Sequence, residues 1–74
     1  MTVTFDNPDA LYTAKDVAAY LRTTPGAMAV ERHRGDGPTF IRAGRRVLYR
    51  AGDLAEWLRE HTVVPAGSPA PQRE

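Results

Sequence analysis

The sequence feature that most constrains the fold is a break between two segments with helical periodicity. Before the interruption, apolar residues recur at helical spacing, at Ala14, Val17, Ala18 and Leu21. This period predicts a helix over about 13–22. Thr24 then supplies a capping hydroxyl, and Pro25 suits the first position of a new helix. A second helix is therefore predicted over about 25–34, with Gly35 past its C-terminus.

The second half of the chain predicts a β-hairpin followed by a third helix. Two β-rich runs, 39–42 and 47–50, flank Gly44, where a tight turn needs a positive φ. We expect one face of the hairpin to be buried through Ile41, Val47 and Tyr49. Asp53 lies near the start of a third helix over about 52–61, where its charge suits the positive helix end.

Length and composition limit the class of protein. The chain has 74 residues, enough for one domain, and it has no cysteine for a disulfide or a thiolate metal site. No apolar run is long enough to cross a membrane, so we expect a small soluble protein of the cytoplasm. We divide it into an N-terminal arm (1–10) with a candidate short strand at 2–5, a folded domain (11–61) and a disordered tail (62–74).

Charge is unevenly distributed along the chain. Residues 22–50 contain seven arginines against Glu31 and Asp36, a net charge of +5. The remaining residues contain three basic and seven acidic side chains, a net charge of −4. A basic middle between two acidic ends points to a polyanionic partner. Nine of the ten basic residues are arginines, whose guanidinium groups suit phosphate and guanine.

No catalytic constellation is visible in the sequence. His33 and His61 have no cysteine partners and no carboxylates at helical ligand spacing. The only serine, Ser68, lies in the tail, which argues against a Ser-His-Asp arrangement. His61 is better explained as a C-terminal residue of the third helix that interacts with the helix dipole. We therefore expect no enzyme activity, metal, cofactor or small-molecule ligand.

Arginines crowd the predicted hairpin. They are Arg42, Arg45, Arg46 and Arg50, with Gly44 at the turn. One interpretation is a solvated hairpin whose charges protect its edges. The interpretation that we favour is a DNA-binding wing that follows the phosphate backbone or enters the minor groove. Leu48 should point away from Val47 and Tyr49, so it is a candidate protein contact on the outer face.

The second helix presents a small apolar face opposite Met28. Gly26, Ala29, Val30 and His33 lie on this face. Such a face can lie close in a major groove and touch thymine methyl groups, or Ala29 and Val30 can instead pack against the hairpin. We assign DNA recognition on this helix to Thr24, Gly26, Ala29, Val30, Arg32, His33 and Arg34.

The two closely spaced helices suggest a helix-turn-helix, although many small helical domains share this spacing. The full series of motifs resembles the MerR-like excisionase domains over about residues 11–60. The matching segments are LYTAKDVAAYL (11–21), TPGAM (24–28), RHRGDGP (32–38), FIRAGRRVLYR (40–50) and DLAEWL (53–58). The order of the motifs is more specific than any one of them.

The resemblance implies an α+β fold, mainly α, in which three helices and a β-hairpin wing form a winged helix-turn-helix. It implies binding to double-stranded DNA, with recognition by the second helix and a wing whose tip is Gly44-Arg45-Arg46. One departure is Glu31, where the family commonly has tryptophan. We expect Glu31 to pair with Arg32 or Arg34, or to accept a hydrogen bond from cytosine N4.

The leading hypothesis is an excisionase, an architectural DNA-binding protein that directs a phage or integrative-element integrase toward excision. Several copies would self-associate on adjacent sites in the host bacterial cytoplasm, bend the DNA and contact the integrase. One alternative is a small MerR-like or AlpA-like transcriptional regulator that uses the same surface at a promoter. An alternative of another class is a protein-interaction module, such as an antitoxin or anti-repressor, without the steep salt dependence of phosphate contacts.

Overall fold

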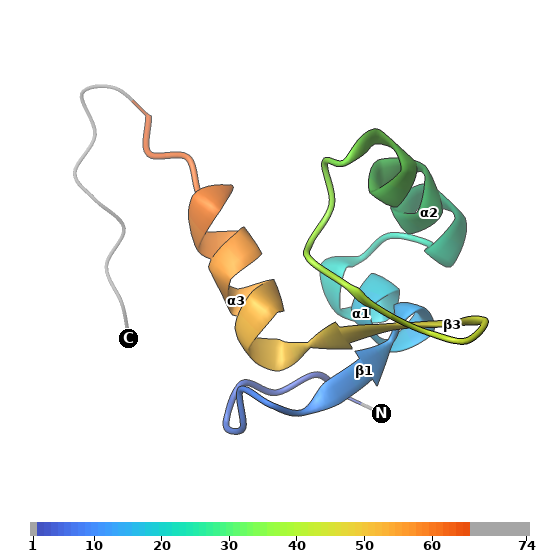
Figure 1. The fold of residues 1–74 in the computed structure, drawn as a ribbon. Helices are drawn as coiled ribbons and strands as arrows, with labels where there is room; N and C mark the ends of the chain where they lie inside the picture. The colour runs from blue at the N-terminus through green and yellow to red at the C-terminus, as the bar shows by residue number, and fades with distance from the viewer. Residues whose placement is uncertain (1, 66–74) are drawn as a thin grey trace.

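The computed structural model describes residues 2–65, which form three helices and a three-stranded antiparallel sheet. The elements are β1 (Leu11–Thr13), α1 (Ala14–Leu21), α2 (Pro25–Arg34), β2 (Ile41–Ala43), β3 (Arg46–Arg50) and α3 (Ala51–Glu60). α2 and the tip of the β2–β3 hairpin lie at one end of the molecule, and α3 lies at the other (Figure 1). The predicted fold, a mainly helical α+β winged helix-turn-helix, is confirmed.

Local capping fixes both ends of α1. Thr13 Oγ1 accepts from the Asp16 backbone N–H at 3.1 Å, and Asp16 Oδ2 accepts from the Thr13 N–H at 3.2 Å. This reciprocal pair is a capping box. The helix ends where Arg22 takes a left-handed conformation with φ of 61°. The Thr23 N–H then donates to the Ala18 carbonyl at 2.9 Å, so the chain turns sharply toward α2.

α2 has the bounds that the sequence predicts. Thr24 is its N-cap, since Thr24 Oγ1 accepts from the Ala27 N–H at 3.1 Å, and Pro25 is the first helical residue. Gly35 ends the helix with φ of 80°, a conformation that costs glycine little. Met28 is fully buried, as its spacing predicts.

The sheet differs from the prediction at its edge. β3 is the central strand, with β1 on one side and β2 on the other. The prediction of a strand at 2–5 is wrong, because this segment forms no strand. The strand β1 at Leu11–Thr13 was not predicted. The N-terminal arm instead packs beside the sheet: Val3 is buried in the core, and the Thr4 N–H donates to the Tyr12 hydroxyl at 3.1 Å.

Strand register corrects the expected buried face of the hairpin. A two-residue turn pairs Ala43 with Arg46, so Ile41 lies opposite Leu48. Directly opposed residues share one face of a sheet, and Ile41 therefore lies on the outer face with Leu48. Val47 and Tyr49 lie on the inner face as expected. The expectation for Ile41 is wrong, because a shift of one residue in register moves a side chain to the other face.

The core joins the arm, the sheet and all three helices. Its buried members are Val3, Tyr12, Val17, Ala18, Met28, Tyr49, Ala51 and Leu54. The first amides of α3 are satisfied by the arm, since the Ala51 N–H donates to the Ala10 carbonyl and the Gly52 N–H to the Pro8 carbonyl, both at 2.9 Å. Of the tail expected at 62–74, residues 66–74 lie outside the described residues.

Candidate nucleic-acid interface

The outer face of α2 is accessible along its length. The exposed residues on and beside this face are Thr24, Gly26, Val30, His33 and Arg34, and Ala29 is half-buried. By helical spacing, Gly26, Val30, His33 and Arg34 lie on the side of α2 away from Met28, which is fully buried. The face is narrow and apolar at its centre, so it can approach a groove floor closely but carries few groups that hydrogen-bond to base edges.

Arg32 is held within the fold by specific contacts, and its assignment as a DNA contact stays a prediction. Its Nη1 donates to the Tyr49 hydroxyl at 2.8 Å, and its guanidinium lies 5.7 Å from the centre of the Phe40 ring. Tyr49 is fully buried on β3, so its hydroxyl needs a partner within the fold. Arg32 therefore joins α2 to the sheet.

A second bond holds the loop that follows α2. The indole Nε1 of Trp57 in α3 donates to the Asp36 carbonyl at 3.0 Å. Together with the bond between Arg32 and Tyr49, it anchors the C-terminal end of α2 to both the sheet and α3. The orientation of α2 relative to the hairpin is therefore fixed by specific hydrogen bonds as well as by packing.

The wing presents its arginines to solvent. Gly44 forms the tip with φ of 64°, and Arg42, Arg45 and Arg46 are exposed beside it. None of these three arginines forms an ion pair with another residue of the range 2–65. The Arg42 guanidinium lies 5.8 Å from the centre of the Phe40 ring. The wing and the outer face of α2 lie at the same end of the molecule (Figure 1).

Arg50 lies apart from the wing tip. It is the last residue of β3, roughly 13 Å from Arg46 at the rise of an extended strand. Its Nη1 lies 3.4 Å from Asp53 Oδ2 in the first turn of α3. The structure therefore places Arg50 beside α3, while Arg42, Arg45 and Arg46 stay together at the hairpin.

Glu31 also faces the interior. It is half-buried and lines a hollow of about 410 Å³ between α2 and α3, together with Trp57 and His61. The expected ion pairs with Arg32 or Arg34 are not formed within residues 2–65. Glu31 is half-buried at the hollow beside Trp57 and His61, and its expected contact with cytosine stays a prediction.

The sequence analysis did not predict the contacts that two aromatic residues, Phe40 and Tyr49, make with arginines. Phe40 is partly exposed between the guanidinium groups of Arg32 and Arg42, and the Tyr49 hydroxyl is the acceptor for Arg32. Aromatic residues alternating with arginines along 40–50 are the signal that points to such contacts. Leu48 lies half-buried on the outer face of the sheet as expected, and its role as a protein contact stays a prediction.

Both histidines lie on the surface. His61 is the C-cap of α3, its Nδ1 is 2.8 Å from the Trp57 carbonyl oxygen, and its ring stacks on Trp57 at 4.3 Å. Across the described part of the chain, no group of three or more histidine, cysteine or acidic side chains is arranged to hold a metal ion. No helix within 2–65 is long and apolar enough to span a membrane.

The exposed face of α2 and the arginine-rich wing define a winged helix-turn-helix protein, a class that binds double-stranded DNA with its second helix in the major groove. A family model described as a helix-turn-helix domain matches residues 11–62. The chain therefore belongs to the helix-turn-helix domain family. Searches among curated proteins and among solved structures returned no significant match.

Proposed function

We propose that this chain is an excisionase, which binds DNA beside an attachment site, bends it and directs an integrase toward excision without catalysing a reaction itself. The observation that carries the proposal is the pair of exposed arginines in the wing, Arg45 and Arg46, together with the exposed outer face of α2. In this proposal the protein acts in the bacterial cytoplasm, and its partners are DNA, the integrase and further copies of itself.

The surface supports a mode of binding that depends on the phosphate backbone. The centre of the α2 face, Gly26 and Val30, carries no side-chain hydrogen-bonding group, so direct base readout is limited. Affinity then rests on arginine contacts with phosphate and on the ease with which the DNA bends. A single domain of this kind buries a small area of DNA, and cooperative binding of several copies supplies the missing affinity.

The first experiment is a gel-shift titration on a duplex from the attachment region, with a random duplex as control and circularly permuted probes to detect bending. We expect stepwise cooperative complexes, a bend, and an affinity that falls steeply with salt, with a log–log slope of about −0.9 per phosphate contact. A single unbent complex at a promoter would instead identify a transcriptional regulator. A lack of salt-sensitive DNA binding would reject the DNA-binding proposal and leave a protein-interaction module.

Matched arginine variants test the wing. Arg45→Ala and Arg46→Ala should each weaken binding to specific and random DNA alike and make the salt slope shallower by about 0.9. Arg59→Ala is the control, because it removes the same charge from α3, where Arg59 pairs with Glu56 at 3.0 Å. On a single-site duplex, where contacts between copies play no part, the control should bind DNA nearly as the wild type does. Equal losses in all three variants would refute the assignment of the wing.

A further inference from the structure

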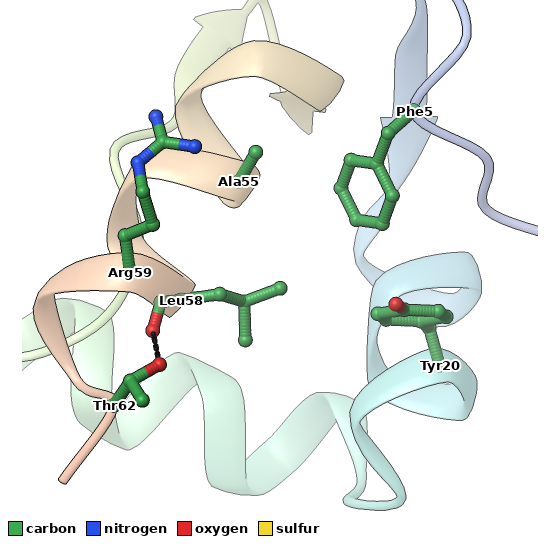
Figure 2. Close-up of a pocket in the computed structure, with 6 residues that line it drawn as sticks. All are labelled: Phe5, Tyr20, Ala55, Leu58, Arg59 and Thr62. Carbon is green, nitrogen blue, oxygen red and sulfur yellow. Dashed lines mark hydrogen bonds between the residues drawn. The ribbon is translucent and has the colours of Figure 1, made fainter. Parts of the chain in front are cut away.

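An open groove of about 320 Å³, lined by both apolar and polar side chains, separates α3 from α1 and the N-terminal arm. Its lining residues are Phe5, Tyr20, Ala55, Leu58, Arg59 and Thr62. Figure 2 shows the Leu58 side chain pointing from α3 toward the rings of Phe5 and Tyr20. These two rings meet edge to face with centroids 5.6 Å apart, yet Phe5 is 38% and Tyr20 43% exposed. The groove therefore leaves aromatic surface in water.

The chain leaves α3 at the rim of this groove. Thr62 Oγ1 donates to the Leu58 carbonyl at 2.7 Å and so forms part of the lining (Figure 2). The next two residues, Val63 and Val64, are 82% and 44% exposed. Two exposed valines thus follow directly on Thr62 at the rim of the groove, and neither of them lines the groove of its own chain.

We propose that the groove receives Val63 and Val64 of a second copy bound at a neighbouring DNA site. Because the groove and the valines are adjacent, two copies related by a two-fold axis can exchange them reciprocally. No residue that lines the groove belongs to α2 or the hairpin, so this exchange leaves the proposed DNA-binding surface free. The inference rests on the proposed function and specifies how its cooperativity arises.

The size of the contact explains why DNA is needed. A standard stable interface uses about 20–30 residues on each side, whereas this exchange centres on two valines and the few residues of the groove. Association in free solution is therefore weak, and the free protein is a monomer. Two copies held on neighbouring sites experience an effective concentration near the millimolar range, at which a small apolar contact suffices.

Cysteine crosslinking tests the proposal directly, because the chain has no native cysteine. Val63→Cys and Tyr20→Cys proteins are mixed and oxidised mildly, with a duplex from the attachment region that carries two adjacent binding sites. We expect a disulfide-linked pair of two 8.2 kDa chains on this duplex and little without DNA. Leu11→Cys is the control in place of Tyr20→Cys, because Leu11 is 48% exposed but lies on the outer face of the sheet.

The outcomes separate the inference from the proposed function. DNA binding without the crosslink would overturn the inference alone. A crosslink within one chain of the double variant Val63→Cys/Tyr20→Cys, without a linked pair in the mixture, would also overturn it, because each chain would then fill its own groove. Absence of any DNA binding would overturn both.

A cooperativity measurement gives an independent readout without oxidation. Val63→Ser combined with Val64→Ser should leave the affinity for a single-site duplex unchanged and lower the cooperativity on a two-site duplex by roughly tenfold or more. Leu11→Ser is the matched control and should change neither quantity. Unchanged cooperativity in the valine variant, with normal thermal unfolding, would overturn the inference.

Discussion

Replacing Arg32 with alanine should destabilise the whole domain, because the structure uses this side chain to hold α2 on the sheet. The Arg32 guanidinium donates to the hydroxyl of the fully buried Tyr49 at 2.8 Å and covers one side of the Phe40 ring at 5.7 Å. Both contacts cross between α2 and the segment that forms the wing. Their loss therefore loosens the relation between the two DNA-binding elements.

The expected loss of stability depends on which polar groups each variant leaves without a hydrogen-bond partner. Arg32→Ala leaves a buried hydroxyl without its donor, which costs about 1–3 kcal/mol, and removes a cation–π contact worth about 0.5–1 kcal/mol at a partly exposed site. We expect the free energy of unfolding to fall by about 2 kcal/mol, a decrease in Tm of roughly 10 °C for a domain of this size. Tyr49→Phe removes the hydroxyl together with the bond, and the half-exposed guanidinium regains water, so the expected loss is about 1 kcal/mol.

Urea unfolding of the two single variants and the double variant measures these values. The double variant should lose less than the sum of the singles, with a coupling energy of about 1 kcal/mol. Arg34→Ala is the control, because Arg34 is exposed on the same helix and its loss should change stability by less than about 0.5 kcal/mol. Wild-type stability in Arg32→Ala, together with weaker DNA binding, would refute this reasoning and restore Arg32 as a direct DNA contact.

Three further substitutions test local features by the same unfolding assay. Thr13→Ala removes the capping hydroxyl of α1 and should lower stability by about 1 kcal/mol; an unchanged midpoint would contradict the capping box. Arg22→Gly relieves a left-handed residue and should raise stability by about 1 kcal/mol, whereas a decrease would show that the arginine side chain contributes more than its backbone costs. Gly52→Ala places a Cβ 3.2 Å from the Cβ and carbonyl oxygen of Pro8 and should lower stability by about 1 kcal/mol. A gain in stability would mean that the N-terminal arm shifts to accommodate the new Cβ, and that the higher helix propensity of alanine outweighs the cost of the close contact.

The helices and the hairpin could be predicted because their signals are local. Thr24 and Gly35 mark the two ends of α2, and Gly44 marks the turn of the hairpin. Each of these residues acts within a few positions of its own place in the chain. Capping and turn chemistry depend on those neighbours alone, so the helix boundaries were predicted within about one residue, while β2 begins two residues later than predicted.

The edge strand and the strand register could not be predicted in the same way. β1 has three residues, Leu11–Thr13, too few to show an alternating pattern, and its pairing partner β3 lies in the other half of the chain. The face of Ile41 depends on which residues the turn pairs, because neighbouring residues of a strand point to opposite faces. Long-range pairing decides both features.

The inward positions on α2 illustrate how helical spacing can outweigh charge. Arg32 lies four residues after Met28 and Glu31 lies three residues after it, and both spacings return to the same side of a helix. Because both side chains are charged, we expected them on the exposed face of α2. In the structure, Arg32 donates to the Tyr49 hydroxyl and Glu31 lines the hollow beside Trp57. The spacing from a buried residue was the stronger signal.

The outer face of α2 carries few polar side chains that could contact DNA bases. With Arg32 and Glu31 turned inward, His33 and Arg34 are the polar side chains left near the C-terminal end of that face, and Thr24 is left at its start. With so few polar side chains, this face can distinguish only a few base pairs, because each bidentate contact reads one base pair. In the proposed function, selectivity for one region of DNA comes from the deformability of the duplex and from several copies acting together. If the proposed contact between copies at the groove forms, it matters to target choice as much as the wing and α2 do.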